Sequence, residues 1–451
     1  KILVKLLLNY KNMNKKKPKN YLFENSVLNF ESFTNDFTQE LYNEFDNKSK
    51  ELNLRSKIHD LLDGKIVNET ENQAAWHPKY KKRKPNINNH LTKLIEKISK
   101  NKKSDKINII IIGIGGSYEG PKLLIESLNS FEINKKFNFQ FLTGSDLTEF
   151  IHKTYLLDPS DTIFIVSSKS FKTDETINML MKAMDWSSIN DNFIAITANP
   201  DEAKNYGINK NNIITFDKEI GGRYSIWSPI AELPIIEKNQ YKSFLEGGKT
   251  AEIALVEDDE YFSFIKRLSF SDLWNNNLKN KNTRVILSYI WLFRSLSDYF
   301  QQLEMESLGK PVNMKSGYKN TGQIIFGGYG PMAQHSYFQL LHQGSQKICA
   351  DIIASKSDNN DLAYAQAVTQ SNLLSKGARD LKENEKINGN ISVNLFLLNK
   401  VDAFTLGYLI TMWEHRTFIS SVLLSINPFD QFGVNAGKIY TKRYLEHKIQ
   451  S

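Results

Sequence analysis

Ile107-Asn-Ile-Ile-Ile-Ile112-Gly113-Ile-Gly-Gly-Ser117 is the stretch that decides the fold of this chain. It joins a continuous apolar run of strand length to a turn of small residues, and a helical pattern begins near Tyr118. Continuous apolar runs separated by helices indicate a parallel sheet that is covered on both faces. The stretch therefore predicts the opening strand, turn and helix of a doubly wound α/β domain.

The same alternation continues along the chain and predicts two sheets. The first is expected to contain residues 107–112, 139–142, 162–166, 193–197 and 212–216, and the second residues 284–289, 323–326, 350–354 and 392–397. A chain of 451 residues is too long for one ordinary core, so two domains are expected. We divide it into an N-terminal arm (1–44), a first domain (45–240), a second domain (241–440) and a tail (441–451). A long apolar helix over 402–424 is expected to pack between the domains or against a second subunit.

Charge and cysteine content narrow the class of protein. The net charge of +8 is spread along a chain rich in Lys, so we expect no nucleic-acid partner, and the run Lys79–Lys84 is interpreted as a solvated loop. The apolar start, residues 1–8, is interrupted by Lys5 and is interpreted as non-targeting. No segment has the length needed to cross a membrane. Cys349 is the only cysteine, which fits a buried thiol in the reducing cytosol.

Three segments with phosphate-binding chemistry each follow a predicted strand. They are Gly113–Ser117, Ser168-Lys-Ser-Phe-Lys-Thr173 and Gly221-Gly-Arg223-Tyr-Ser225. In open parallel sheets the ligand lies beyond the carboxyl ends of the strands, where helix N-termini can hold a phosphate. The glycine segment lacks the spacing of a dinucleotide site and the lysine of a Walker loop, and by itself it is equally a turn without function. The second segment has more polar side chains than a helix cap needs.

A carboxylate and an imidazole supply groups for proton transfer near neutral pH. Glu306 lies in Tyr299-Phe-Gln-Gln-Leu-Glu-Met-Glu306-Ser-Leu-Gly-Lys310, and His335 lies in residues 330–344. Taken alone, Glu306 is equally a surface carboxylate at a helix end. No cluster of Cys, His or acidic residues has the spacing of metal ligands, so no metal is expected. Together with the phosphate segments, the pair suggests acid/base chemistry on a phosphorylated substrate.

These segments, in this order, resemble the glucose-6-phosphate isomerase family. Asn68-Glu-Thr-Glu71-Asn-Gln-Ala-Ala-Trp-His77, Glu414-His-Arg-Thr-Phe418 and the stretch 426–438 extend the resemblance over roughly residues 60 to 440. It implies two parallel-sheet domains of the sugar-isomerase (SIS) type with additional helices. It also implies a cytoplasmic aldose–ketose isomerase of glycolysis and gluconeogenesis that interconverts glucose 6-phosphate and fructose 6-phosphate without a cofactor.

The resemblance also implies roles for individual residues. Glu306 matches the base that moves a proton between C2 and C1, and Arg223 matches the cation that faces the reacting carbons. His335 and Lys438 match residues that assist ring opening, and the family's histidine comes from the partner subunit, which implies a homodimer. Residues expected to bind the substrate are Gly116, Ser117, Ser168, Lys169, Ser170, Thr173, Gly222, Gln302 and Gln431.

The sequence departs from the usual family pattern at several points. The residues of the loop Gly327–Ala333 differ from those of the family. Gln73 replaces an arginine and Leu308 replaces an asparagine. Ser170 and Lys172 each replace a threonine. His342 and His415 are expected to form hydrogen bonds in the core. Two other functions remain open: a non-catalytic sugar-phosphate-binding regulator on the same fold, and an isomerase of broader specificity that includes mannose 6-phosphate.

Overall fold

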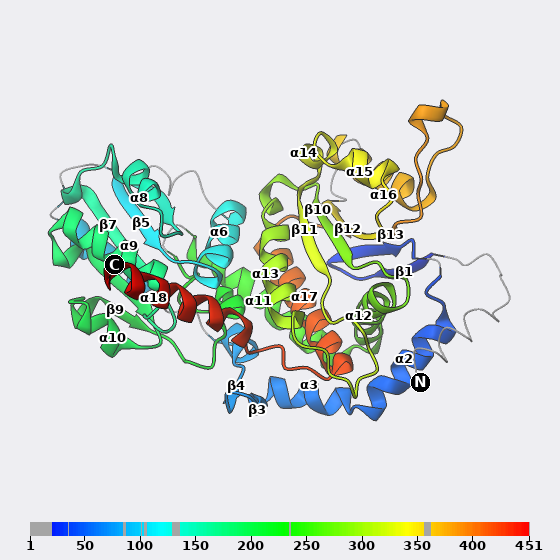
Figure 1. The fold of residues 1–451 in the computed structure, drawn as a ribbon, viewed down its shortest axis with the longest axis horizontal. Coiled ribbons are helices and arrows are strands. Elements are labelled where there is room, and N and C mark those ends of the chain that lie inside the picture. Colours follow the sequence, from blue (N-terminus) through cyan, green and yellow to red (C-terminus); the bar gives the residue numbers. More distant parts are fainter. Residues whose placement is uncertain are drawn as a thin grey trace.

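A computed structural model describes residues 20–34, 36–83, 87–100, 102, 106–128, 136–233, 236–355 and 362–450. The N-terminal stretch 1–8, expected to be non-targeting, lies outside these residues. Figure 1 shows two sheets side by side, each with helices packed on it. The expected α/β class with two parallel-sheet units is confirmed.

The first sheet has five parallel strands in the order β6-β5-β7-β8-β9. Their bounds are β5 Ile107–Ile112, β6 Phe137–Leu142, β7 Thr162–Ser167, β8 Phe193–Thr197 and β9 Ile213–Thr215. The isoleucines of β5 explain its burial: Ile109 and Ile111 enter the largest core, whereas Ile110 and Ile112 enter a separate core on the opposite face. Since β6 and β7 flank β5, the chain leaves β5 and β7 in opposite directions along the sheet, and a crevice forms between their ends.

Helices follow these strands at the edge where the crevice lies. They are α6 (Gly116–Leu128), α8 (Leu147–Thr154), α9 (Asp174–Ser187) and α10 (Pro200–Asn205). The helix expected near Tyr118 begins two residues earlier, at Gly116, because the glycine turn is already its first turn. The helix expected near Asp174 begins there.

The second sheet has six strands in the order β1-β2-β13-β12-β10-β11. Its parallel part is β10 (Thr283–Ser288), β11 (Ile324–Tyr329), β12 (Ile348–Ser355) and β13 (Ser392–Leu398), as expected from the sequence. The antiparallel strands β1 (Tyr21–Glu24) and β2 (Leu28–Ser32) extend its edge, with Phe30 opposite Phe396. Part of the segment expected to be an arm therefore belongs to this sheet.

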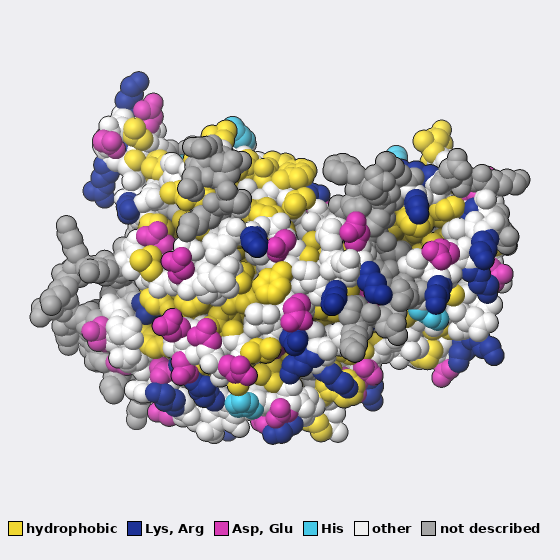
Figure 2. All heavy atoms as spheres, turned by 180° about the vertical axis from the view of Figure 1, so that it is seen from behind, with side chains coloured by type: hydrophobic (Ala, Val, Ile, Leu, Met, Phe, Trp, Pro, Cys, Tyr) yellow, Lys and Arg dark blue, Asp and Glu magenta, His cyan; other side chains and the backbone are white. Residues whose placement is uncertain are grey.

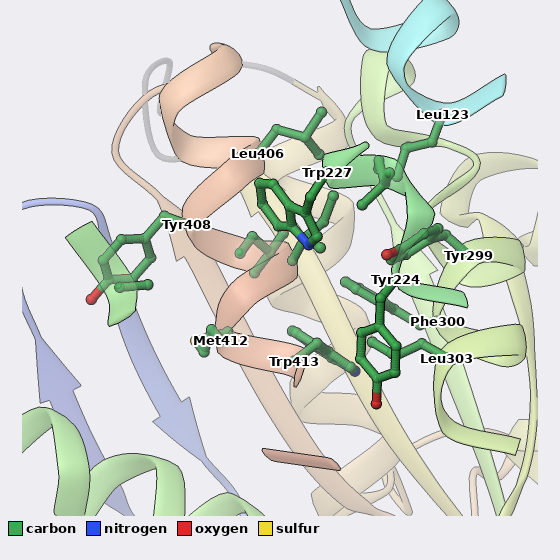
Figure 3. Packing of buried hydrophobic residues seen from close by; sticks show 14 of the residues in the cluster. Leu123, Tyr224, Trp227, Tyr299, Phe300, Leu303, Leu406, Tyr408, Met412 and Trp413 are labelled. Atoms are coloured by element: carbon green, nitrogen blue, oxygen red, sulfur yellow. The ribbon is translucent and has the colours of Figure 1, made fainter. Parts of the chain in front are cut away.

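The long helix α17 (Ala403–Leu424) is covered by helices of its own chain. It packs against α11 (Lys238–Glu257), α12 (Asp259–Asn277) and α13 (Leu296–Leu308). Figure 3 shows Trp413 of α17 facing Phe300 of α13, and these rings stack at a centroid distance of 4.2 Å. Nearly all of α17 is buried in the single chain, so its apolar sequence does not require a second subunit.

The signature Glu414-His-Arg-Thr-Phe has a structural role within this helix. The interpretation of the run from Lys79 as a solvated loop is wrong in its described part, because residues 79–81 end the helix α4 and Lys81 is buried. Lys81 Nζ lies 2.5 Å from a carboxylate oxygen of both Glu252 and Glu414, and all three side chains are buried. Trp227 Nε1 donates to the other oxygen of Glu414 at 2.6 Å. Removing one partner of such a buried network typically costs about 3–5 kcal/mol of folding free energy. Because Trp227 belongs to the 3₁₀ segment η4 (Gly222–Trp227), the network fixes η4 on α17.

Smaller elements complete the fold. They are α2 (Gln39–Glu51), α3 (Leu54–Leu62), β3 (Ile66–Asn68), β4 (Gln73–Ala74), α4 (His77–Lys81), α5 (Ile87–Ser99), α14 (Gly330–Gln334), α15 (Phe338–Gln343), α16 (Leu362–Lys376) and α18 (Asn435–Gln450). Across the described ranges, no helix combines the length and apolar character of a membrane span. Figure 2 shows basic and acidic side chains interspersed on the rear face.

Two expectations about individual side chains, for Cys349 and His415, are confirmed, and a third is confirmed in part, because His342 forms a hydrogen bond but is only half-buried. Cys349 is buried in β12. His342 is hydrogen-bonded through Nε2 to Gln370 at 2.9 Å, and the buried His415 lies 3.4 Å from the hydroxyl of Tyr261. Neither histidine is part of the cleft described below.

Candidate active site

A cleft of about 610 Å³ opens at the carboxyl ends of the first sheet's strands. Most of the residues that sequence reasoning selected for substrate binding line it. They are Gly116, Ser117, Ser168, Lys169, Ser170, Thr173, Gly222 and Gln431, and Lys438, selected for ring opening, also lines the cleft. Segments that are far apart in the sequence therefore meet at one site.

The glycines of two motifs pack directly on each other at the base of this cleft. A Cβ at Gly116 would lie 1.8 Å from the carbonyl oxygen of Gly222, so no larger residue fits there. Ser225 Oγ donates to the carbonyl of Gly116 at 2.8 Å and holds the two segments together. Gly116 is also the first residue of α6, where free amide groups and the helix dipole favour an anion.

The hydroxyl-rich loop after β7 is held in one conformation by its aromatic residue. Phe171 is fully buried and has a left-handed backbone (φ 55°), which is costly for a residue with a large side chain. Ser168 Oγ accepts from the amide of Phe171 at 3.1 Å. Thr173 is the N-cap residue of α9, yet its side chain makes no capping bond and lies 3.5 Å from Ser168 Oγ. These hydroxyls face the cleft in greater number than capping requires, as the sequence predicts.

Lysines and a carboxylate set the charge of the cleft. Lys169, Lys218 and Lys438 line it, and Glu71 faces them. Burial lowers the pKa of Lys169, and the negative charges of Glu71 and Glu219 oppose that shift. A desolvated ammonium group is compensated by binding an anion, so the cleft is suited to a phosphate group.

Beside the cleft, Arg223 and Glu306 form an ion pair. Arg223 Nη1 lies 3.0 Å from Glu306 Oε2 and donates to Gln431 Oε1, also at 3.0 Å. Gln302 Nε2 donates to the same oxygen of Glu306 at 3.3 Å, one helical turn earlier on α13. The Arg223 side chain is 1% exposed and that of Glu306 is 28% exposed, so the carboxylate is the accessible member of the pair. A substrate in the cleft could reach it.

The segment 427–431 supports the arginine through its backbone. Arg223 Nη2 donates to the carbonyl oxygens of Pro428 (2.7 Å) and Asp430 (2.8 Å). The carboxylate of Asp430 accepts from Thr70 Oγ1 at 2.7 Å and lies 3.0 Å from Lys310 Nζ. The early motif around Asn68–Glu71 and the closing motif are therefore in contact.

His335 is not brought to this cleft. It lies at the C-terminal end of α14, with its side chain exposed, whereas Lys438 reaches the cleft from α18. The stretch Gly327–Ala333, expected to be a loop, is the end of β11 and most of α14, and a Cβ at Gly327 would lie 1.8 Å from the carbonyl oxygen of Ile286. Leu308, where the family has an asparagine, is buried in the core.

Sequence reasoning missed several residues of the cleft. Glu71, Ser167, Thr176, Asn199 and Lys218 also line it. Asn199 and Lys218 follow β8 and β9, so the rule that ligands lie at the carboxyl ends of strands could have found them. Glu71 reaches the cleft from outside the sheet, and no local pattern indicates this. Within the described ranges, no group of three or more His, Cys, Asp or Glu side chains could hold a metal ion.

A cleft of this kind, with a carboxylate and an arginine beside phosphate-binding turns, belongs to the class of sugar-phosphate isomerases. Comparison with known sequences identifies one family within that class. The model of the phosphoglucose isomerase family matches residues 32–451, so the chain belongs to that family.

Relatives of known name agree with this assignment. A glucose-6-phosphate isomerase of Shewanella amazonensis is 32% identical over 448 residues, which are 86% of this chain and 82% of the relative. That of Wigglesworthia glossinidia brevipalpis is 31% identical, over 94% of this chain and 89% of the relative.

Solved structures share the fold. A glucose-6-phosphate isomerase from Chlamydia trachomatis superimposes with a TM-score of 0.80 at 22% identity, over 95% of this chain and 90% of that one. A hypothetical protein of Thermus thermophilus superimposes with a TM-score of 0.71 at 20% identity, over 95% of this chain and 100% of that one. At these sequence identities, both similarities show a shared fold.

Proposed function

We propose that this protein interconverts glucose 6-phosphate and fructose 6-phosphate. The observation that carries the proposal is the contact of 3.0 Å between Arg223 and Glu306, because it sets a base beside a fixed cation at the edge of a phosphate-binding cleft. Relatives at 31–32% identity that cover most of the chain are named glucose-6-phosphate isomerases.

The hydroxyls of Ser117, Ser168, Ser170 and Thr173 and the ammonium of Lys169 bind the phosphate. Binding energy from this remote group positions the open-chain sugar. Glu306 removes the proton from C2 and returns it to C1, while the hydroxyl proton of O2 moves to O1. The cis-enediolate between these steps carries negative charge on oxygen, which Arg223 stabilises. The oxidation of C2 is balanced by the reduction of C1, so the reaction needs no external oxidant or reductant and no redox cofactor.

The cyclic sugar must open first, which needs a proton on the ring oxygen and the loss of one from the anomeric hydroxyl. Lys438 acts from the same chain. His335 acts from a partner subunit, since in the single chain it is exposed and lies outside the cleft. Met332, three residues earlier, is 68% exposed, and Trp291, which is 5.2 Å from Tyr329 between ring centroids, is 56% exposed. Such apolar surface next to His335 supports a homodimer.

We place the enzyme in the cytoplasm, in glycolysis and gluconeogenesis. A single buried cysteine suits a reducing compartment, because the fold uses no disulfide.

A coupled assay of the purified protein with fructose 6-phosphate tests the proposal directly. Turnover to glucose 6-phosphate is expected. Tight binding of the sugar phosphate without turnover would instead identify a non-catalytic regulator. Turnover of mannose 6-phosphate in the same assay would show broader specificity, because that epimerisation returns the C2 proton to the opposite face.

A further inference from the structure

We infer that Lys310 is a positioning residue, which holds the Arg223 guanidinium in the orientation that faces Glu306. The inference rests on the proposed isomerase function. Lys310 lies just beyond the end of α13, four residues after Glu306, and neither lines the cleft nor has been given a role above.

Lys310 is directed away from solvent and toward the closing segment. Its side chain is 11% exposed, and that of Asp430, with which it pairs at 3.0 Å, is 9% exposed. The ammonium also donates to the backbone carbonyl of Asp430. Burial lowers the pKa of Lys310, so keeping this cation inside the protein costs free energy.

One carbonyl group links this lysine to the arginine of the site. The carbonyl oxygen of Asp430 accepts from Lys310 and, at 2.8 Å, from Arg223 Nη2. The Asp430 carboxylate provides the compensating charge and is itself held by Thr70 (2.7 Å) and Asn427 (3.0 Å). Two cations therefore converge on one backbone oxygen whose position is fixed from the opposite side.

These contacts close a ring. Glu306 and Lys310 belong to the same short segment, Lys310 binds the Asp430 carbonyl, that carbonyl binds Arg223, and Arg223 contacts Glu306 at 3.0 Å. The guanidinium is planar with donors in fixed directions, so its orientation depends on where the carbonyl lies. Without Lys310, Asp430 loses its charged partner and the segment that carries Gln431 loses its anchor to α13.

The test compares Lys310→Met with Lys310→Arg in the coupled assay with fructose 6-phosphate. For Lys310→Met we expect kcat to fall about 10- to 100-fold while KM changes less than about threefold, because a misplaced catalytic group costs rate and not phosphate binding. Solvent deuterium incorporation at C2 should slow by the same factor. Lys310→Arg, which keeps the charge and its donors, should recover most of the rate.

Lys266→Met is the matched control. Lys266 is also a nearly buried lysine paired with one aspartate, Asp46, but it lies on α12, away from the cleft. It should lose stability and keep kcat. Equal loss of kcat in both variants, or an unchanged kcat in Lys310→Met, would overturn the inference. If Lys310→Met does not fold, Asp430→Asn replaces it, and an unchanged kcat there would have the same meaning. Absence of turnover in the wild type would instead refute the proposed function.

Discussion

Arg223 and Glu306 form an ion pair of 3.0 Å, although one lies beside the first sheet and the other on a helix of the second. Tyr299, also on α13, donates its hydroxyl to the backbone carbonyl of Arg223 at 3.1 Å. The two halves of the molecule are thus in contact through the guanidinium and the carboxylate that are proposed to act in the reaction. A change in how the sheets pack would change the distance between the proposed base and its cation.

Glu306→Gln should separate proton transfer from ring opening. The amide keeps the shape and can still hydrogen-bond, but it is not a base near neutral pH. We expect isomerisation to fall by roughly three or more orders of magnitude, within the range for loss of a general base. Anomer interconversion and substrate binding should largely survive, and NMR of deuterium uptake at C2 measures the missing step. Uptake at the wild-type rate would assign the base to another residue.

Replacing Ser170 and Thr173 by Ala should weaken substrate binding more than catalysis. Their proposed contacts with the phosphate would be equally present in the ground and transition states, so KM should rise while kcat changes little. Thr148→Ala, an exposed hydroxyl outside the cleft, is the control and should leave both constants unchanged. A large fall in kcat at constant KM would contradict the phosphate assignment.

Mixing two inactive proteins should restore activity if His335 serves the neighbouring subunit. His335→Ala and Glu306→Gln homodimers each lack one group at every site, but a heterodimer formed by subunit exchange has one complete site. Activity should therefore return at the rate of subunit exchange. That rate is measured separately from the mass of heterodimers formed between differently tagged subunits. Continued inactivity after proven exchange would place both residues in the same subunit's site.

Acid should destabilise the protein through His77. This side chain is buried and stacks on Tyr224 at 4.2 Å between ring centroids, and burial holds its pKa well below its usual value. As the pH falls below about 6.5, the unfolded chain binds a proton that the folded one does not, so the free energy of unfolding decreases by up to about 1.4 kcal/mol per pH unit.

Urea unfolding at about pH 7.5, 6.5 and 5.5 measures this dependence. His77→Gln should make it less steep, while His90→Gln, an exposed residue on α5, should not. The buried His415, whose pKa is also lowered by burial, should preserve part of the dependence in the variant. An identical slope in His77→Gln and the wild type would show that His77 titrates normally.

The sequence alone determined the strands of both parallel sheets and the segments that meet in the cleft. Runs such as Ile107–Ile112 carry a local signal, because a strand buried on both faces must be apolar throughout. The loops that follow such strands share one edge of a sheet, so the order of strands and loops along the chain is sufficient to group Ser117 with Ser168.

The way distant segments complete these units depends on tertiary contacts that no local pattern reports. The strands β1 and β2 join the second sheet through the pairing of β2 with β13, which leaves β1 at the edge, and with four and five residues both are too short to give a clear signal in the sequence. Glu71 lines the cleft from outside the sheet, and Lys310 and Asp430 are connected to Arg223 through an ion pair and hydrogen bonds between parts of the chain that are remote in sequence. Periodicity reports only which face of an element is buried, whereas these contacts depend on where whole elements lie in space.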